Sequence, residues 1–222
     1  MNTLPCSFRQ GQPRSWVLAA LVLGGPALLP SAHGFTVDIT PGPRALFLQV
    51  GVGTMTGGTF NNNGTPGDNG SVNTASVTVP GAQIGSGITQ TMTTNSTVTA
   101  SAWNGAALCN SPATTGQVYV GGFYRRPGNG GAAATLSVST PAALVNAKGD
   151  TLAFNNVAWT SSGNGDPTPT IPNGLFTAGT QTLLVVTRNT WFESCLAFRY
   201  LNTQLVPAGT FTGRAIFTLA AP

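Results

Sequence analysis

Residues 35–52 read FTVDITPGPRALFLQVGV, and the Pro-Gly-Pro of residues 41–43 divides this stretch into two runs. Apolar residues occupy every second position on both sides of the break: Phe35, Val37 and Ile39, then Leu46, Leu48, Val50 and Val52. Successive side chains of a β-strand point to opposite faces, so a period of two is typical of a strand with one buried face. The stretch therefore predicts two short strands separated by a turn.

The same signal recurs along the chain, between clusters of Gly, Pro, Asn and Ser. The further candidates are Val72–Val79, Ile88–Thr99, Gln117–Tyr124, Ala134–Thr140, Thr151–Trp159, Gln181–Arg188, Cys195–Leu201 and Phe211–Leu219. No sustained helical periodicity separates them, which favours antiparallel hairpins and Greek-key connections over βαβ units. We expect an all-β, antiparallel, immunoglobulin-like β-sandwich of about nine or ten strands.

Composition supports this fold class. Only 6% of the 222 residues are Asp, Glu, Lys or Arg, whereas 41% are hydrophobic. Helical bundles need many charged residues on their wet faces, and a disordered chain needs few apolar residues, so both classes are excluded. Thr, Ser, Asn and Gly must supply the polar surface.

The first 34 residues have the features of a secretory signal peptide. Arg9 and Arg14 give a positive start, residues 16–29 are apolar, and Ala32-His33-Gly34 resembles a small-x-small cleavage site. The alternative is a retained membrane span, but this run is interrupted by Gly-Gly-Pro and is shorter than a span requires. We expect cleavage, a single domain over residues 35–222 without a stable membrane span, and export by the general secretory route to the periplasm, cell surface or medium.

Removal of this segment lowers the positive charge of the chain. Arg9 and Arg14 are lost. The remaining residues include seven cations and five acids, so the net charge falls from +4 to +2. The remaining cations are scattered, and Arg125 and Arg126 are the only adjacent pair. Nucleic-acid binding needs a concentrated basic face, so we expect no nucleic-acid partner.

Two cysteines, Cys109 and Cys195, remain after cleavage. An exported chain meets an oxidising compartment, so the pair predicts a disulfide. A pair of reactive thiols is the alternative, but neither a Cys-x-x-C spacing nor a basic neighbour supports it.

The single histidine, His33, lies in the predicted signal peptide. A mature chain without histidine lacks the usual general base, the His-dependent triads and imidazole metal ligands. We therefore expect no enzyme activity, no metal and no cofactor. A hydrolase built on two carboxylates remains a less favoured alternative; its candidate acids are Asp38, Asp68, Asp150, Asp166 and Glu193.

The C-terminal residues 206–219, VPAGTFTGRAIFTL, resemble the closing segment of bacterial pilins of the chaperone–usher type, in which a Pro-x-Gly-Thr-aromatic turn enters a final strand. The resemblance implies a sandwich that lacks one strand, which the N-terminal extension of another subunit supplies. The candidate assembly residues are Phe35, Val37, Ile39, Phe211, Phe217 and Leu219. The alternative is that residues 35–40 form the first strand of a self-complete domain.

Aromatic residues and arginines provide the candidate ligand contacts, which are Trp103, Tyr124, Arg125 and Arg126. Trp159, Trp191 and Phe123 are further aromatic candidates for a carbohydrate-stacking platform, unless they belong to the core. The leading hypothesis is a non-enzymatic cell-surface or pilus-like protein with a structural or adhesive role, which assembles with itself or with other surface subunits. The alternative is a secreted carbohydrate-binding module with a glycan as its ligand.

Overall fold

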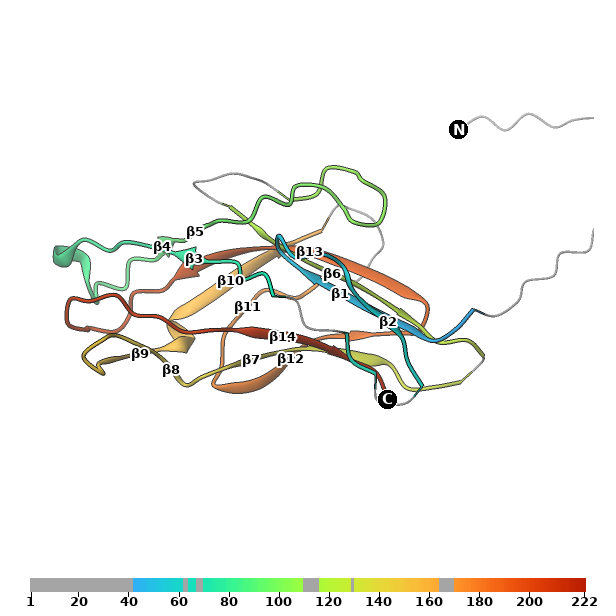
Figure 1. Cartoon of the computed structure of the whole chain (residues 1–222). Helices are drawn as coiled ribbons and strands as arrows, with labels where there is room; N and C mark the ends of the chain where they lie inside the picture. Colours follow the sequence, from blue (N-terminus) through green and yellow to red (C-terminus); the bar gives the residue numbers. More distant parts are fainter. Residues whose placement is uncertain (1–41, 62–63, 67–69, 110–115, 129, 164–169) are drawn as a thin grey trace, which may run out of the picture. The chain divides into compact units, whose positions relative to one another are not determined.

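Antiparallel strands dominate the part of the chain that the structure describes (Figure 1). The computed structural model describes residues 42–61, 64–66, 70–109, 116–128, 130–163 and 170–222, all within the unit Thr40–Pro222. Helix is limited there to two single 3-10 turns, η1 (Gly81–Gln83) and η2 (Phe154–Asn156). The predicted all-β class is confirmed. The predicted signal peptide and the candidate strand Phe35–Thr40 lie outside the described residues.

The larger sheet forms one layer of the sandwich. In spatial order its strands are β11 (Gly174–Leu175), β10 (Val157–Ser162), β13 (Thr190–Tyr200), β6 (Val118–Arg125), β1 (Ala45–Val50) and β2 (Thr56–Thr59), and β4 (Gln90–Thr91) also pairs with β13. All its pairs are antiparallel. Neighbours such as β1, β6 and β13 are far apart in the sequence, as Greek-key connections require.

The smaller sheet has the order β12 (Gly179–Val186), β7 (Ala134–Thr140), β14 (Ile216–Ala220). The sequence of β7, ATLSVST, alternates strictly between buried and half-buried positions, which matches the period of a strand. Two ribbons complete the described strands: β3 (Ala75–Ser76) pairs with β5 (Thr93–Thr94), and β8 (Ala143–Val145) pairs with β9 (Thr151–Ala153).

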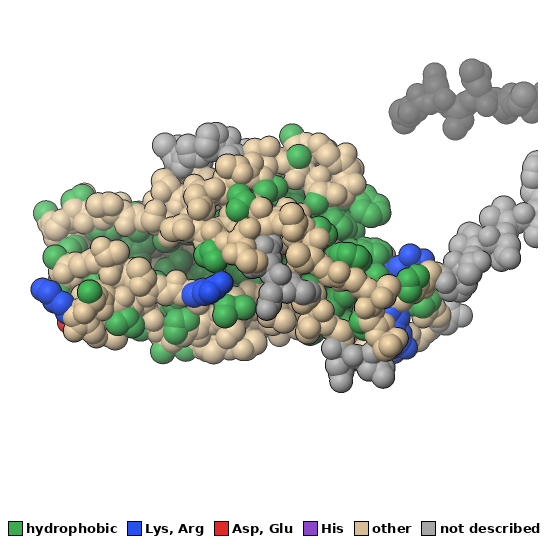
Figure 2. Space-filling view, in the orientation of Figure 1, with side chains coloured by type: hydrophobic (Ala, Val, Ile, Leu, Met, Phe, Trp, Pro, Cys, Tyr) green, Lys and Arg blue, Asp and Glu red, His purple; other side chains and the backbone are tan. Residues whose placement is uncertain are grey.

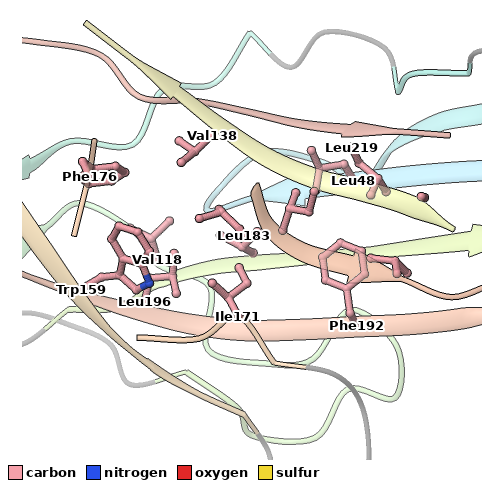
Figure 3. Close-up of a cluster of buried hydrophobic side chains, with 14 of the residues drawn as sticks. Leu48, Val118, Val138, Trp159, Ile171, Phe176, Leu183, Phe192, Leu196 and Leu219 are labelled. Carbon is pink, nitrogen blue, oxygen red and sulfur yellow. The ribbon is translucent and has the colours of Figure 1, made fainter. Parts of the chain in front are cut away.

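The inner faces of the two sheets share one hydrophobic core, and their side chains point toward each other in Figure 3. Leu48 and Phe192 of the larger sheet belong to the same cluster as Val138 and Leu219 of the smaller one. Packing of two antiparallel sheets over a shared core defines a β-sandwich, as predicted.

The number of strands differs from the prediction, because the described residues form fourteen rather than nine or ten. The candidates Val72–Val79 and Ile88–Thr99 yield only the two-residue strands β3, β4 and β5. Side chains replace part of the ladder there: the backbone N–H of Thr74 donates to the side-chain oxygen of Asn95, at 2.8 Å. Asn and Thr side chains compete in this way with regular pairing.

Candidate functional site

β14 is the edge strand of the smaller sheet. It pairs with β7 from Ile216 to Ala220. On its other side, the described residues provide one isolated bridge, in which the N–H of Ala221 donates to Gly64 at 2.9 Å. Backbone groups alternate in direction along a strand, so those of Phe217 and Leu219 point to the same side as those of Ala221. An edge of this kind can accept another strand.

The predicted assembly residues of the C-terminal segment have different positions. Leu219 is fully buried, and half-buried Phe217 packs against the same core. Phe211 lies before β14, which begins at Ile216 and not at residue 211 as predicted. The chain around Phe211 instead pairs with the β8–β9 ribbon, through a bridge between Thr212 and Val145. Phe35, Val37 and Ile39 lie outside the described residues.

A narrow apolar crevice, too small to hold a water molecule, lies in the core beside β14. Its lining residues come from both sheets and the loop before β12: Trp159, Phe176, Leu183, Leu196 and Phe217. Figure 2 shows that the surface between the two layers is hollowed, with hydrophobic side chains at the bottom of the recess. The edge of β14 and the crevice together combine an apolar surface with main-chain groups that pair with no strand among the described residues.

A second feature is a loop that covers the outer face of the larger sheet. We call residues 95–109 the covering loop; it precedes β6 and lies over β13 and β6 in Figure 1. Its two arms pair with each other, since the N–H of Ser101 donates to Ala106 and that of Leu108 to Thr99, both at 2.8 Å. The loop turns at Gly105, whose φ of +73° is readily adopted only by glycine.

Three outward-facing residues of β13 hold this loop at alternate positions. Cys195 forms the predicted disulfide with Cys109, with 5.4 Å between the two Cα atoms. Glu193 accepts a hydrogen bond from the hydroxyl of Ser101 at 2.9 Å. Trp191 stacks at an angle on Trp103, with 5.3 Å between the ring centroids. Because alternate side chains of a strand point to the same face, all three contacts of β13 reach the same loop.

Glu193 is almost completely buried under the covering loop, together with Tyr119 of β6. The hydroxyl of Tyr119 donates to the same carboxylate oxygen, Oε2, at 3.2 Å. Gly121 lies opposite Glu193 and leaves room for the Tyr119 ring, because a Cβ at residue 121 would lie only 2.1 Å from the Tyr119 hydroxyl. The network therefore depends on a glycine as well as on its three polar groups.

This environment raises the pKa of Tyr119 above its ordinary value of 10.0. Burial is the largest cause, followed by the negative charge of Glu193 and the hydrogen bond to it. In the unfolded chain Tyr119 ionises near pH 10, whereas the folded protein keeps the proton. The stabilisation is complete below pH 10 and is lost as the pH rises above that value.

We therefore expect the free energy of unfolding to fall as the pH rises from about 10 to about 12, because the unfolded state loses the Tyr119 proton first. Tyr119→Phe should be less stable than the native protein at the lower pH and should show a shallower decline. The free energy of unfolding of this variant must still decline to some extent as the pH rises, since burial also raises the pKa of Tyr200. Urea unfolding curves across this range measure both effects; equal slopes for the two proteins would contradict the role of Tyr119.

The aromatic ligand candidates fall into two groups. Trp103 is 62% exposed, and Trp191 and Phe123 are half-buried. Trp159 and Tyr124 are buried in the core, and the Tyr124 hydroxyl donates to the carbonyl of Ala132 at 2.9 Å. The prediction of Tyr124 as a ligand contact is therefore wrong, because the alternation of β6 turns this side chain inward.

The two candidate arginines also lie in different places and have different contacts. Arg125 lies on the outer face of β6, and its guanidinium packs over Gly42, where a Cβ would collide with it. Arg126 follows the strand; its N–H donates to Asn189 at 3.2 Å and its guanidinium to Pro222 at 3.4 Å. Arg126 thus connects Pro222 to the loop before β13, and of these two arginines only Arg125 lies on the sheet face.

The structure does not bring the two described acids together. Glu193 lies under the covering loop, whereas Asp150, in the turn between β8 and β9, accepts a hydrogen bond from Asn146 at 2.8 Å. Asp38, Asp68 and Asp166 lie outside the described residues. Within the described residues, no group of three or more acids, cysteines or histidines could hold a metal ion.

Ser101, Tyr119 and Phe47 lie in no sequence pattern that marks a site, and in the sequence Glu193 is only one of five scattered acids. Phe47 lies opposite Phe123 on the outer face, a position visible in the alternation of β1 once β6 is its neighbour. The burial of Tyr119 and Glu193 depends on a loop distant in sequence, for which the period of the strands holds no signal.

No helix in the described part of the chain is long and apolar enough to cross a membrane. Comparisons of the chain with family models, curated protein sequences and solved structures give no match. The function must therefore be inferred from the residues and their arrangement.

Proposed function

We propose that this chain is an exported, non-enzymatic surface subunit that assembles by strand addition at the free edge of β14. The observation that supports this proposal is the edge itself: one side of β14 pairs with β7, its other side makes a single bridge with the described residues, and Phe217 of the same strand lines an apolar crevice. The C-terminal resemblance to chaperone–usher pilins points the same way.

Strand addition needs two things from the acceptor. Main-chain groups along the edge supply hydrogen bonds, and pockets for alternate side chains supply specificity. Phe217 contributes to both, since it belongs to the edge strand and lines the crevice. Ile216, its neighbour, is 55% exposed and points away from the core.

The occupant that we propose is residues 35–40 of a second copy of the chain. Their sequence, FTVDIT, offers three apolar side chains at alternate positions and polar residues between them. It is short enough to match β14, which has five residues. Burial of Phe35, Val37 and Ile39 against the lining of the crevice, which must widen to receive them, would supply the hydrophobic part of the binding energy.

The test uses chain 35–222 and two matched variants of the donor segment. Val37→Arg places a charge on the apolar face of the segment, whereas Thr36→Arg places the same charge on its polar face. We expect native protein and Thr36→Arg to form oligomers in size-exclusion chromatography, and Val37→Arg to remain a folded monomer. A synthetic FTVDIT peptide should raise the melting temperature of the monomer.

The acceptor is tested by Phe217→Ala, with Ile216→Ala as its control on the same strand. We expect Phe217→Ala to weaken peptide binding and Ile216→Ala to leave it unchanged. The self-complete alternative predicts a monomeric native protein that Val37→Arg unfolds and that ignores the peptide. That combination of results would reject assembly by strand addition.

A further inference from the structure

A row of aromatic residues crosses the outer face of the larger sheet, away from the β14 edge. The register aligns Phe47 of β1 with Phe123 of β6, and Phe123 with Trp191 of β13. Trp103 of the covering loop extends the row by its contact with Trp191. These four residues, which we call the aromatic row, are partly or largely exposed and do not pack against the main core.

The exposed end of this row is held in a fixed position. The hydroxyl of Ser101 accepts hydrogen bonds from the N–H groups of Trp103 and Asn104, at 3.1 and 3.3 Å, while it donates to Glu193. A buried carboxylate is costly unless its hydrogen bonds are satisfied. Here that carboxylate orients a turn that displays a largely exposed tryptophan, and a fixed aromatic side chain loses little entropy on binding.

The base of the row carries an unused hydrogen-bond donor. The indole Nε1 of Trp191 is buried and has no partner among the described residues. Buried donors are normally paired, so a single unpaired one requires an explanation. A hydroxyl that enters beside the Trp103 ring would provide the missing acceptor after a small shift of that ring.

A cation accompanies the row on the same face. Arg125 is two residues from Phe123 along β6, so both side chains point outward. Its guanidinium makes no hydrogen bond or ion pair with a residue that the structure describes. The planar guanidinium matches the two oxygens of a carboxylate. The one described acid on this face of β6 and β13, Glu193, is buried below the covering loop.

We propose that the aromatic row and Arg125 form a binding site for acidic oligosaccharides, with sugar rings against Trp103 and Trp191 and a uronate carboxylate at Arg125. Aromatic faces with one aligned cation suit an oligosaccharide whose sugar rings have apolar faces and whose sugar units each carry one negative charge. A nucleic acid would need several cations along its phosphates, whereas Arg125 is the one described cation next to the aromatic row and Arg199 lies at the far end of β13. The site is separate from the β14 edge and does not rest on the proposed assembly.

The experiment measures binding of chain 35–222 to hexasaccharides by isothermal titration calorimetry and tryptophan fluorescence. Oligogalacturonate, oligoalginate and hyaluronan are the acidic probes, and maltohexaose is the neutral reference. We expect at least one acidic probe to bind more tightly than maltohexaose and to change the tryptophan emission. Trp103→Ala should weaken that binding about tenfold or more, as for a central aromatic contact.

Two charge variants of equal size separate a specific site from general attraction. Arg125→Gln should abolish the preference for the acidic probe over maltohexaose. Arg199→Gln removes the same charge from an exposed residue at the other end of β13 and should leave the preference intact. Equal losses in the two variants, or unchanged binding by Trp103→Ala, would overturn the proposal.

Other partners give different results in the same experiment. Binding to vesicles of phosphatidylglycerol with no binding to any of the four oligosaccharides would assign the face to a lipid surface and reject the glycan site. Absence of binding to every probe would reject it as well. Circular dichroism of each variant confirms that the fold is retained, so a loss of binding reports on the site.

Discussion

Replacement of both Cys109 and Cys195 by serine should lower the free energy of unfolding by about 4 kcal/mol, the loop-closure value for a cross-link of this length. The two residues are 86 positions apart, so the disulfide removes many conformations from the unfolded chain. It also fastens the covering loop to β13, next to Tyr119. Urea unfolding of the oxidised protein and of the double variant measures the difference.

The matched control for this prediction is Val98→Ala. Val98 packs against the disulfide and Tyr119, so its truncation removes local packing but keeps the cross-link. We expect a loss of about 1–2 kcal/mol, in proportion to the apolar surface that is no longer buried. If the double serine variant and the oxidised protein unfold at the same urea concentration, the disulfide does not provide the stabilisation that we assign to it.

Truncation of Trp159 to alanine should cost about 3–5 kcal/mol, the range for a large aromatic side chain in a core. Trp159 is 3% exposed, and its ring centroid lies 4.9 Å from that of Phe176. Its indole N–H donates to the carbonyl of Pro172 at 2.8 Å, which ties the loop before β11 to the core. The variant loses packing on both sheets and leaves the Pro172 carbonyl without its donor.

Two other tryptophan variants make this prediction specific. Trp159→Phe keeps an aromatic ring but loses the hydrogen bond, so its cost should be intermediate. Trp103→Ala should lower the free energy of unfolding by no more than about 1.5 kcal/mol, because its exposed ring makes a single aromatic contact, with Trp191. Equal losses for Trp103→Ala and Trp159→Ala in thermal or urea unfolding would show that core position does not determine the effect.

The sequence predicts the strands best where hydrophobic alternation is strict. Ala134–Thr140 coincides with β7, and the alternation around Leu46 and Leu48 gives β1. The prediction is poorest for Val72–Val79 and Ile88–Thr99, where apolar residues alternate with Thr, Ser and Asn. Those polar side chains bond to the backbone of adjacent segments, and only three-dimensional neighbours decide whether a ladder forms instead.

The candidate sites depend even more on neighbours. The disulfide follows from the chemistry of an exported pair of cysteines, but the covering loop that it holds has no sequence signal of its own. The position of Tyr124, in contrast, follows from the sequence pattern of its own strand. Val118 and Val120 set the inward face of β6, so the even-numbered Tyr124 points inward as well, and the same register puts Phe123 and Arg125 outside.

The free edge of β14 has a further consequence for the order of folding. The smaller sheet consists of β7, β12 and β14, so its last strand comes from residues 216–220 of the 222-residue sequence. β1 likewise pairs with β6, which follows about 70 residues later in the sequence. Such distant pairings make folding slow and leave unpaired edges exposed for long periods. Wherever β14 has not yet paired, β7 lacks one neighbour, and any strand present at high concentration competes with β14 for that place.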